Sequence, residues 1–120
     1  MTTYLVRHAS AGSRDDADPD DHQRALDDVG RLQAEKLAAW LQHEPISRIV
    51  ASPYLRCVQS VEPLAAACGL EVEQADRLAE GTSIERSWKL LAQVAAGTAV
   101  LCSHGDVIPD LVRRAQGRGV

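Results

Sequence analysis

The chain has 120 residues, 45% of them hydrophobic, which is enough for one core and too short for two ordinary domains. Its formal net charge of -4 excludes the broad basic surface that binds a nucleic-acid polymer, although a small pocket can still concentrate positive potential around one anion. No segment reaches membrane-spanning length, and the N-terminus lacks the basic start and apolar run of a signal peptide, so we expect a cytoplasmic protein with no membrane partner.

The N-terminal part of the chain predicts a strand, a long loop and a helix. Thr3 to Val6 is short, apolar and β-prone, and it stops at Arg7-His8. Ala9 to Arg24 is rich in Gly, Ser, Asp and Pro without any period, which is typical of a loop. Small and apolar residues then recur at helical spacing up to Pro45, after two aspartates that suit an electropositive helix start. The recurring residues are Gly30, Ala34, Leu37 and Leu41, and the aspartates are Asp27 and Asp28.

The middle of the chain predicts a second strand and a second helix. Arg48 to Ala51 is the strand, and Ser52-Pro53 is a strong helix start, with Ser as the N-cap and Pro in the first helical position. Arg56 then lies in the first turn of the helix. The helix should end before Gly69, which suits a left-handed conformation, and Pro63 predicts a kink or a break inside it.

The C-terminal part predicts two further units of strand and helix. The third strand covers Leu70 to Gln74, a loop covers Ala75 to Gly81, and Thr82-Ser-Ile-Glu85 is typical of a capping box. The apolar stripe of the helix that it opens is Ile84, Trp88, Leu91 and Ala95. The fourth strand covers Ala99 to Cys102, and the last helix runs roughly from Val107 to Ala115. This alternation predicts an α/β fold of three layers, α/β/α, with a mainly parallel sheet.

Three of the four strands deliver polar side chains to the carboxyl edge of the sheet, where open α/β sheets bind ligands. The first strand supplies Arg7 and His8, the helix start after the second supplies Arg56, and the fourth supplies His104. Guanidinium groups match phosphate oxygens, and the N–H groups of the helix start add to the positive field. We therefore expect a phosphate pocket that uses no metal ion and no cofactor.

A histidine in such a pocket can act as a nucleophile if one ring nitrogen donates to a fixed acceptor and the other is free to attack phosphorus. We expect His8 to become a phosphohistidine, while Arg7, Arg56 and His104 stabilise the charge that develops on the phosphoryl oxygens. Glu80, in the loop after the third strand, is the best-placed carboxylate to protonate the leaving oxygen. The acidic loop offers alternative acids: Asp15, Asp16 and Asp18.

One motif follows each strand of the predicted sheet. The motifs are Arg7-His8-Ala9, Ser52-Pro53-x-x-Arg56-x-x-Gln59-Ser60, Leu78-Ala79-Glu80 and Ser103-His104-Gly105. As a set, spread over about residues 3 to 112, they resemble branch 1 of the histidine phosphatase superfamily, which has a phosphoglycerate mutase-like fold. The resemblance implies that His8 is the nucleophile, that Arg7, Arg56 and His104 clamp the phosphate, and that Glu80 is the general acid.

Two groups within that family are similar to this chain. Arg-His-Ala and the lack of a large insertion resemble the short phosphohistidine phosphatase type, which implies a phosphohistidine protein or a small phosphomonoester as substrate. The residues around Cys57 and from Cys102 to Leu111 are also similar to the phosphatase domain fused to certain Nudix hydrolases, which implies a nucleotide as substrate.

The chain departs from the family pattern at two places. It has Ala25 where the family usually has Pro. Family members usually add a strand after the last helix, so a single domain over residues 1–120 either has a smaller sheet or is a piece of a longer protein. The oligomeric state stays open.

Several residues have two readings on sequence alone. Ser13 and Arg24 either reach the phosphate or its substituent, or they are simply solvated. Trp40 and Trp88 are best explained by core packing, and so are the three cysteines, Cys57, Cys68 and Cys102, which show no C-x-x-C spacing. The rival to an enzyme is a phosphate-binding module with little turnover. A mutase is the rival among enzymes, and it needs a second phosphate subsite, for which the sequence shows no further basic cluster.

Overall fold

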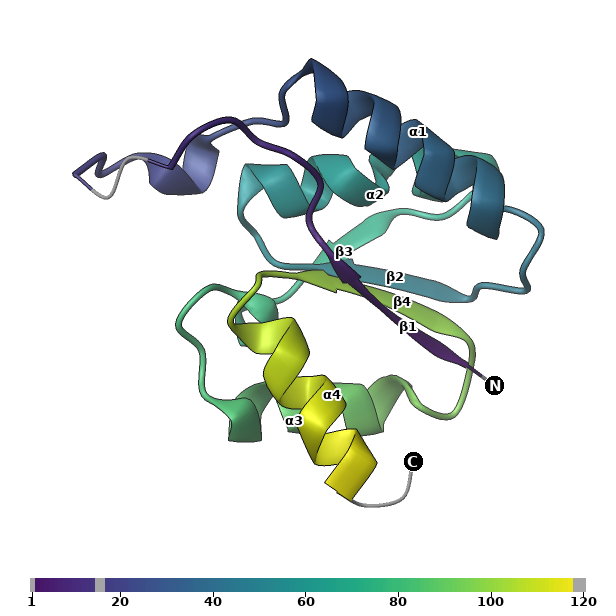
Figure 1. The fold of residues 1–120 in the computed structure, drawn as a ribbon. Helices are drawn as coiled ribbons and strands as arrows, with labels where there is room; N and C mark the ends of the chain where they lie inside the picture. Colours follow the sequence, from purple (N-terminus) through teal and green to yellow (C-terminus); the bar gives the residue numbers. More distant parts are fainter. Residues whose placement is uncertain (1, 15–16, 118–120) are drawn as a thin grey trace.

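Four parallel strands form the centre of the computed structural model, which describes residues 2–14 and 17–117. Their order across the sheet is β1 (Thr3–Arg7), β4 (Ala99–Ser103), β2 (Arg48–Ala51) and β3 (Val72–Gln74). Each strand precedes a helix, in chain order α1 (Asp28–Leu41), α2 (Leu55–Cys68), α3 (Ile84–Val94) and α4 (Val107–Gly117). Helices α1 and α2 cover one face of the sheet and α3 and α4 the other (Figure 1). The three-layer α/β/α fold is therefore confirmed.

The core has two layers because alternate residues of the central strands point to opposite faces of the sheet. Ile49 and Val100 pack in a cluster with α1 and α2, whereas Val50 and Leu101 pack in a cluster with α3. Strand β4 is buried along its whole length. Cys57 and Cys102 belong to the first layer, and Cys68 packs against it half-buried, so the expectation of free cysteines in the core is confirmed.

The start of α2 differs from the predicted one. Ser52 is not the N-cap: its backbone N–H donates to the carbonyl of Cys102 on β4, which keeps Ser52 extended, and the helix begins at Leu55 after Tyr54. Arg56 still lies in the first turn. The break predicted at Pro63 does not occur, because α2 continues to Cys68 and ends at Gly69, whose φ of 68° is left-handed as expected.

Three smaller expectations about the helices were wrong. The N-cap of α3 is Ser83, whose side chain accepts from the backbone of Arg86, rather than Thr82. The most buried residues of α3, namely Ser87, Leu90 and Val94, lie one position before the predicted stripe, although Leu91 of that stripe packs half-buried against the same cluster. Trp40 is 74% exposed and is not a core residue, because it lies on the face of α1 turned away from the sheet.

The loop between β1 and α1 is tied to the start of α1. The carboxylate of Asp27, the N-cap, accepts from the backbone of Gly30 at 2.7 Å, from the backbone of Gly12 at 2.9 Å and from the hydroxyl of Ser10 at 2.6 Å. A Cβ on Gly30 would lie 1.9 Å from the carbonyl oxygen of Ser10, so only glycine permits this approach. The loop is thereby fixed over the carboxyl edge of the sheet. No helix in the described part of the chain is both long and apolar enough to cross a membrane.

Candidate active site

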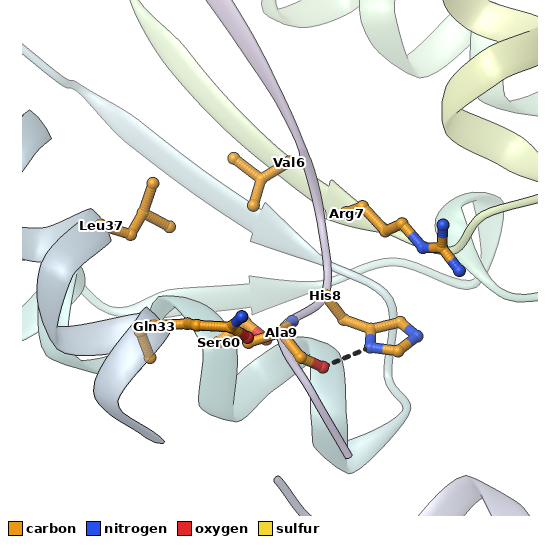
Figure 2. A pocket seen from close by; sticks show the side chains of 8 residues that line it. Val6, Arg7, His8, Ala9, Gln33, Leu37 and Ser60 are labelled. Atoms are coloured by element: carbon orange, nitrogen blue, oxygen red, sulfur yellow. Dashed lines mark hydrogen bonds between the residues drawn. The ribbon is translucent and has the colours of Figure 1, made fainter. Parts of the chain in front are cut away.

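The strand register brings the predicted nucleophile and its partners to one edge of the sheet. Arg7 pairs with Ser103, so the residues that follow, His8 and His104, leave the sheet side by side. The backbone of His8 donates to the carbonyl of Ser103 at 3.0 Å, and the two imidazole centroids lie 5.5 Å apart with a T-shaped arrangement. Figure 2 shows the side chains of Arg7 and His8 projecting to the same side of the end of β1, away from Gln33.

The hydrogen bond of His8 leaves one ring nitrogen available. Its Nδ1 lies 2.8 Å from the carbonyl oxygen of Ala9 (Figure 2). A carbonyl can only accept, so Nδ1 carries the proton and the lone pair of the neutral ring is on Nε2. The backbone N–H of Ala9 donates in turn to the hydroxyl of Ser60 on α2, at 2.8 Å. The acceptor that orients His8 is therefore itself held by α2.

The surroundings of His8 favour its neutral, nucleophilic form. Desolvation lowers the pKa of His8 below its ordinary value of 6.5, and the charge of Arg56 and the neighbouring His104 lower it further. The hydrogen bond to Ala9 and the nearby Cys57 act in the opposite direction but do not reverse the shift. At neutral pH the ring is ready to attack an electrophile rather than to donate a proton.

His104 is held on one side and has an unpaired nitrogen on the other. Its Nε2 lies 2.9 Å from the hydroxyl of Ser52 and 3.5 Å from the thiol of Cys57, and the ring of Tyr54 packs against it at 4.7 Å. The hydroxyl of Ser52 also accepts from the backbone of Tyr54 at 3.3 Å and can donate its own proton to Nε2. In that arrangement Nδ1 carries the ring proton, and this nitrogen is buried with no hydrogen-bond partner in the described structure.

Two buried thiols lie behind His104. A hydrogen bond from the thiol of Cys102, together with the nearby His104, lowers the pKa of Cys57 to about 5. The same hydrogen bond raises the pKa of Cys102, because Cys102 keeps the proton when Cys57 loses its own. Cys57 is completely buried in the core. Its contact with His104 therefore helps to hold the ring rather than to offer a nucleophile to a ligand.

Arg56 is the most deeply placed cation of the site, at 1% exposure. Its Nη1 donates to the carbonyl of Asp21, and its Nη2 donates to the carboxylates of Asp21 at 3.2 Å and Glu80 at 3.1 Å. The guanidinium also lies over the ring of Tyr54, 4.9 Å from its centroid. The Nε–H of Arg56 is buried and has no hydrogen-bond partner among the described residues. Arg56 and His104 thus each present one unsatisfied donor, which is uncommon for buried polar groups.

A single pocket joins these groups. It has a volume of about 370 Å³, and its walls include Arg7, His8, Arg24, Arg56, Glu80 and His104. The structure therefore brings together six of the seven site residues expected from the sequence. Ser13 is exposed and does not line this pocket, although its neighbours Gly12 and Arg14 do. Within residues 2–14 and 17–117, no group of His, Cys, Asp and Glu side chains is arranged to hold a metal ion.

Glu80 lies inside the pocket with both carboxylate oxygens paired. One accepts from Arg56, and the other lies 2.6 Å from the guanidinium of Arg14. The loop that carries Glu80 is fastened to the turn between β4 and α4, since the backbone N–H of Gly81 donates to the carboxylate of Asp106 at 2.8 Å. Among the alternative acids, Asp18 is exposed and outside the pocket wall, and Asp15 and Asp16 lie outside the described residues.

The sequence interpretation missed three residues that shape this site. Arg14 lines the pocket, Asp21 pairs with Arg24 and Arg56, and Tyr54 packs on both Arg56 and His104. Hydrogen bonding from Arg24 lowers the pKa of Asp21, which keeps it an anion beside Arg56. Arg14 and Asp21 lie in a loop without periodicity, so no pattern indicated which side chains turn inward. Arg14 and Arg24 both line the pocket, paired with Glu80 and Asp21, and the absence of a second phosphate subsite stays a prediction.

Comparison with known proteins shows which protein family this chain resembles. Residues 3–85 match the family model described as the histidine phosphatase superfamily (branch 1). An 8-oxo-(d)GTP phosphatase of Mycolicibacterium smegmatis is 35% identical over 116 residues, which are 92% of this chain but 36% of that protein. The chain thus spans little more than a third of this curated relative.

Two solved structures share the fold. The SixA protein of Agrobacterium tumefaciens, described as a phosphohistidine phosphatase, superposes with a TM-score of 0.81 at 22% identity, covering 98% of this chain and 77% of that one. The protein histidine phosphatase SixA complexed with tungstate superposes with a TM-score of 0.77 at 27% identity, covering 93% and 74%.

Proposed function

This chain belongs to branch 1 of the histidine phosphatase superfamily, and on that premise we propose that it hydrolyses phosphomonoesters through a phosphorylated His8. The observation that carries the proposal is the state of His8: Nδ1 is committed to the carbonyl of Ala9, and Nε2 keeps its lone pair in a ring whose pKa is lowered. This is the arrangement that nucleophilic attack on phosphorus requires.

The first step transfers the phosphoryl group to His8. Nε2 attacks phosphorus, the bond to the leaving oxygen breaks, and the charge on the equatorial oxygens is stabilised by Arg7, Arg56 and His104. The Nε–H of Arg56 and Nδ1–H of His104, which are buried with no hydrogen-bond partner in the part of the chain that the structure describes, are the donors best prepared for those oxygens. Fixed cations supply the stabilisation that a metal ion supplies in other phosphatases, so the reaction needs none.

Glu80 is the proposed general acid. It protonates the leaving oxygen, and in the second step the same carboxylate takes a proton from the water that attacks phospho-His8. This role requires Glu80 to give up its pairing with Arg14 and Arg56 when substrate enters, since a protonated carboxyl no longer forms an ion pair. Phosphate oxygens next to Arg56 favour that exchange, because they compete for the guanidinium and repel a second anion.

Turnover of an aryl phosphate with chelator present tests the nucleophile. We expect activity in the wild type and in His43→Asn, which replaces an exposed histidine in the turn after α1, and a loss of at least about a thousandfold in His8→Asn. If all three folded proteins bind phosphate or vanadate without turnover, the chain is a phosphate-binding module and the proposal fails. Equal activity of wild type and His8→Asn contradicts the role of His8 directly.

The leaving group tests Glu80. An aryl leaving group needs little protonation, whereas an alkyl leaving group needs it fully, so Glu80→Gln should reduce turnover of an alkyl phosphate about a hundredfold more than that of a nitrophenyl phosphate. Asp106→Asn is the matched control, because Asp106 also lines the pocket but accepts from Gly81. A uniform loss for both substrates in Glu80→Gln contradicts the acid role.

The substrate is proposed at the level of two classes. A phosphohistidine protein is supported by the fold shared with the SixA proteins, and a cytoplasmic site of action agrees with either class. A nucleotide is supported by the relative that is an 8-oxo-(d)GTP phosphatase. Comparing kcat/KM for a phosphohistidine peptide and a nucleoside phosphate decides between them.

A further inference from the structure

We propose that Ser60 is a positioning residue for the phosphoryl transfer: its hydroxyl fixes the backbone segment that aims the ring of His8 and ties this segment to the backbone of Arg56. The inference rests on the phosphatase activity proposed above and adds a residue that acts through His8 rather than on the substrate. Ser60 lies on α2 and is 1% exposed. Together with Ala9 and Gln33 it lines a cavity of about 280 Å³ next to the end of β1.

The hydroxyl of Ser60 makes two hydrogen bonds with defined directions. Its oxygen lies 2.6 Å from the carbonyl oxygen of Arg56, which can only accept, so the hydroxyl donates its proton there. A lone pair of the same oxygen accepts from the backbone N–H of Ala9 at 2.8 Å. Ser60 therefore connects the segment after β1 with the first turn of α2, and a side chain without a hydroxyl can form neither bond.

The two peptide groups that flank Ala9 are each held by a side chain from a helix. Ser60 holds the first, and Oε1 of Gln33 on α1 accepts from the N–H of Ser10 at 2.9 Å. The second peptide group is planar and contains the carbonyl of Ala9, so fixing its N–H also fixes the direction of that carbonyl. Figure 2 shows Gln33 and Ser60 on one side of this segment and the ring of His8 on the other. Water can replace the contact of exposed Gln33, whereas Ser60 is buried, so we expect Ser60 to be the stronger anchor.

The carbonyl of Ala9 determines which nitrogen of His8 can attack. Nδ1 lies 2.8 Å from that oxygen and carries the ring proton. If the segment shifts, the acceptor moves away and the proton can transfer to Nε2, where it occupies the lone pair that attack on phosphorus needs. The bond to the backbone of Arg56 has a second effect. It holds the nucleophile and the residue that carries the phosphate-binding guanidinium in a fixed relation, as in-line transfer requires.

Steady-state turnover of an aryl phosphate separates positioning from substrate binding. Ser60→Ala should lower kcat by about 10- to 100-fold and change KM by less than about threefold, because it displaces the nucleophile without removing a contact to phosphate. Ser60→Thr should restore kcat to within about threefold of the wild-type value. Threonine keeps the hydroxyl, and the cavity beside Ser60 offers room for its methyl group.

Ser87→Ala is the matched control. Ser87 is a completely buried serine of α3, and its hydroxyl donates to the carbonyl of Ser83 four residues earlier, as the hydroxyl of Ser60 does to Arg56. It lies on the opposite face of the sheet, since α3 covers the face that α2 does not (Figure 1). We therefore expect Ser87→Ala to keep the wild-type kcat.

NMR of the free protein measures the positioning without any turnover. The nitrogen-15 chemical shifts of an imidazole distinguish the protonated nitrogen from the one with the lone pair, and they are read at a pH where the ring of His8 is neutral. The proton should be on Nδ1 in the wild type, Ser60→Thr and Ser87→Ala, and it should divide between Nδ1 and Nε2 in Ser60→Ala. A purely structural role of Ser60 would lower the stability without changing this tautomer.

The outcomes separate this inference from the proposed function. Wild-type kcat in folded Ser60→Ala, an equal loss in Ser60→Ala and Ser60→Thr, or an unchanged tautomer in Ser60→Ala overturns the positioning role and leaves the phosphatase intact. If Ser60→Ala does not fold, Ser60→Cys in reducing buffer replaces the hydroxyl with a weakly bonding thiol of similar shape, and wild-type kcat in that variant overturns the role. If the folded wild type has no turnover, the proposed function fails, and the tautomer alone decides: a change in Ser60→Ala supports the inference, and no change overturns it.

Discussion

Gly105 determines where the guanidinium of Arg7 lies, and replacing it with alanine should disable the site without unfolding the protein. A Cβ at this position would lie 2.9 Å from Cζ of Arg7 and 3.0 Å from its Nη2, closer than real contacts allow. Arg7 is exposed and flexible, so its side chain moves aside at little cost in stability. The movement takes the guanidinium away from the position it occupies over the end of β4, where phosphate oxygens are expected.

The size of the effect follows from the contact that is lost. A hydrogen bond to a charged group contributes about 1.5–3 kcal/mol, so Gly105→Ala should reduce kcat/KM for an aryl phosphate by about 10- to 100-fold. The free energy of unfolding should change by less than about 1 kcal/mol, because the φ of Gly105 is not positive and alanine fits its backbone. Gly117→Ala is the control, since a Cβ there meets no atom within 4 Å.

A double-mutant cycle of Arg7 and Gly105 tests whether the loss of activity comes from the displaced guanidinium. In an Arg7→Ala background, Gly105→Ala has no guanidinium left to displace, so it should cause almost no additional loss of kcat/KM. The assays are steady-state turnover for activity and urea unfolding for stability. Full activity of Gly105→Ala, or equal losses in the presence and absence of Arg7, would refute the argument.

Three further predictions concern His8, His104 and the loop anchor. In NMR titration of the free protein, the imidazole of His8 should titrate below pH 6.5, because burial disfavours its charged form; a titration above 6.5 contradicts the nucleophile assignment. Ser52→Ala should lower kcat by about tenfold and destabilise the protein by about 1–3 kcal/mol, because buried Nε2 of His104 loses the hydroxyl that lies 2.9 Å from it. Unchanged kinetics would show that Ser52 does not position His104. Gly30→Ala should lower the free energy of unfolding by at least about 1–3 kcal/mol, measured in urea, because its Cβ meets the backbone of Ser10; wild-type stability would disprove that close approach.

The succession of strands and helices along the chain was predictable because β1, β2 and β4 are short, largely apolar runs and each is followed by a motif, although β3 is a polar strand of three residues. Strand β2 was predicted residue for residue, and the carboxyl-edge rule placed His8 and His104 together before any geometry was known. The start of α2 was not predictable in the same way. Ser52 is an excellent N-cap by its residue type, but its pairing with β4 and its hydroxyl contact to His104 outweigh that preference.

The sequence did not allow us to predict which residues of the loop between β1 and α1 face the pocket. The path of this loop depends on the carboxylate of Asp27, which accepts hydrogen bonds from Ser10, Gly12 and Gly30. Hydrogen bonds between residues so far apart in the sequence leave no local sequence pattern. The same loop brings Arg14 to Glu80. The residues of the proposed phosphate clamp could therefore be located from sequence motifs, whereas Arg14 and Asp21 in the same pocket region required the folded loop.

Trapping the covalent intermediate tests the central proposal most directly. Protein is mixed with an aryl phosphate, quenched in base after milliseconds to seconds, digested and analysed by mass spectrometry, with His8→Asn and His43→Asn treated in parallel. The account predicts a base-stable phosphate adduct on the peptide that contains His8, present in the wild type and His43→Asn and absent from His8→Asn. Turnover without any adduct on His8, or an adduct on another residue, would contradict it.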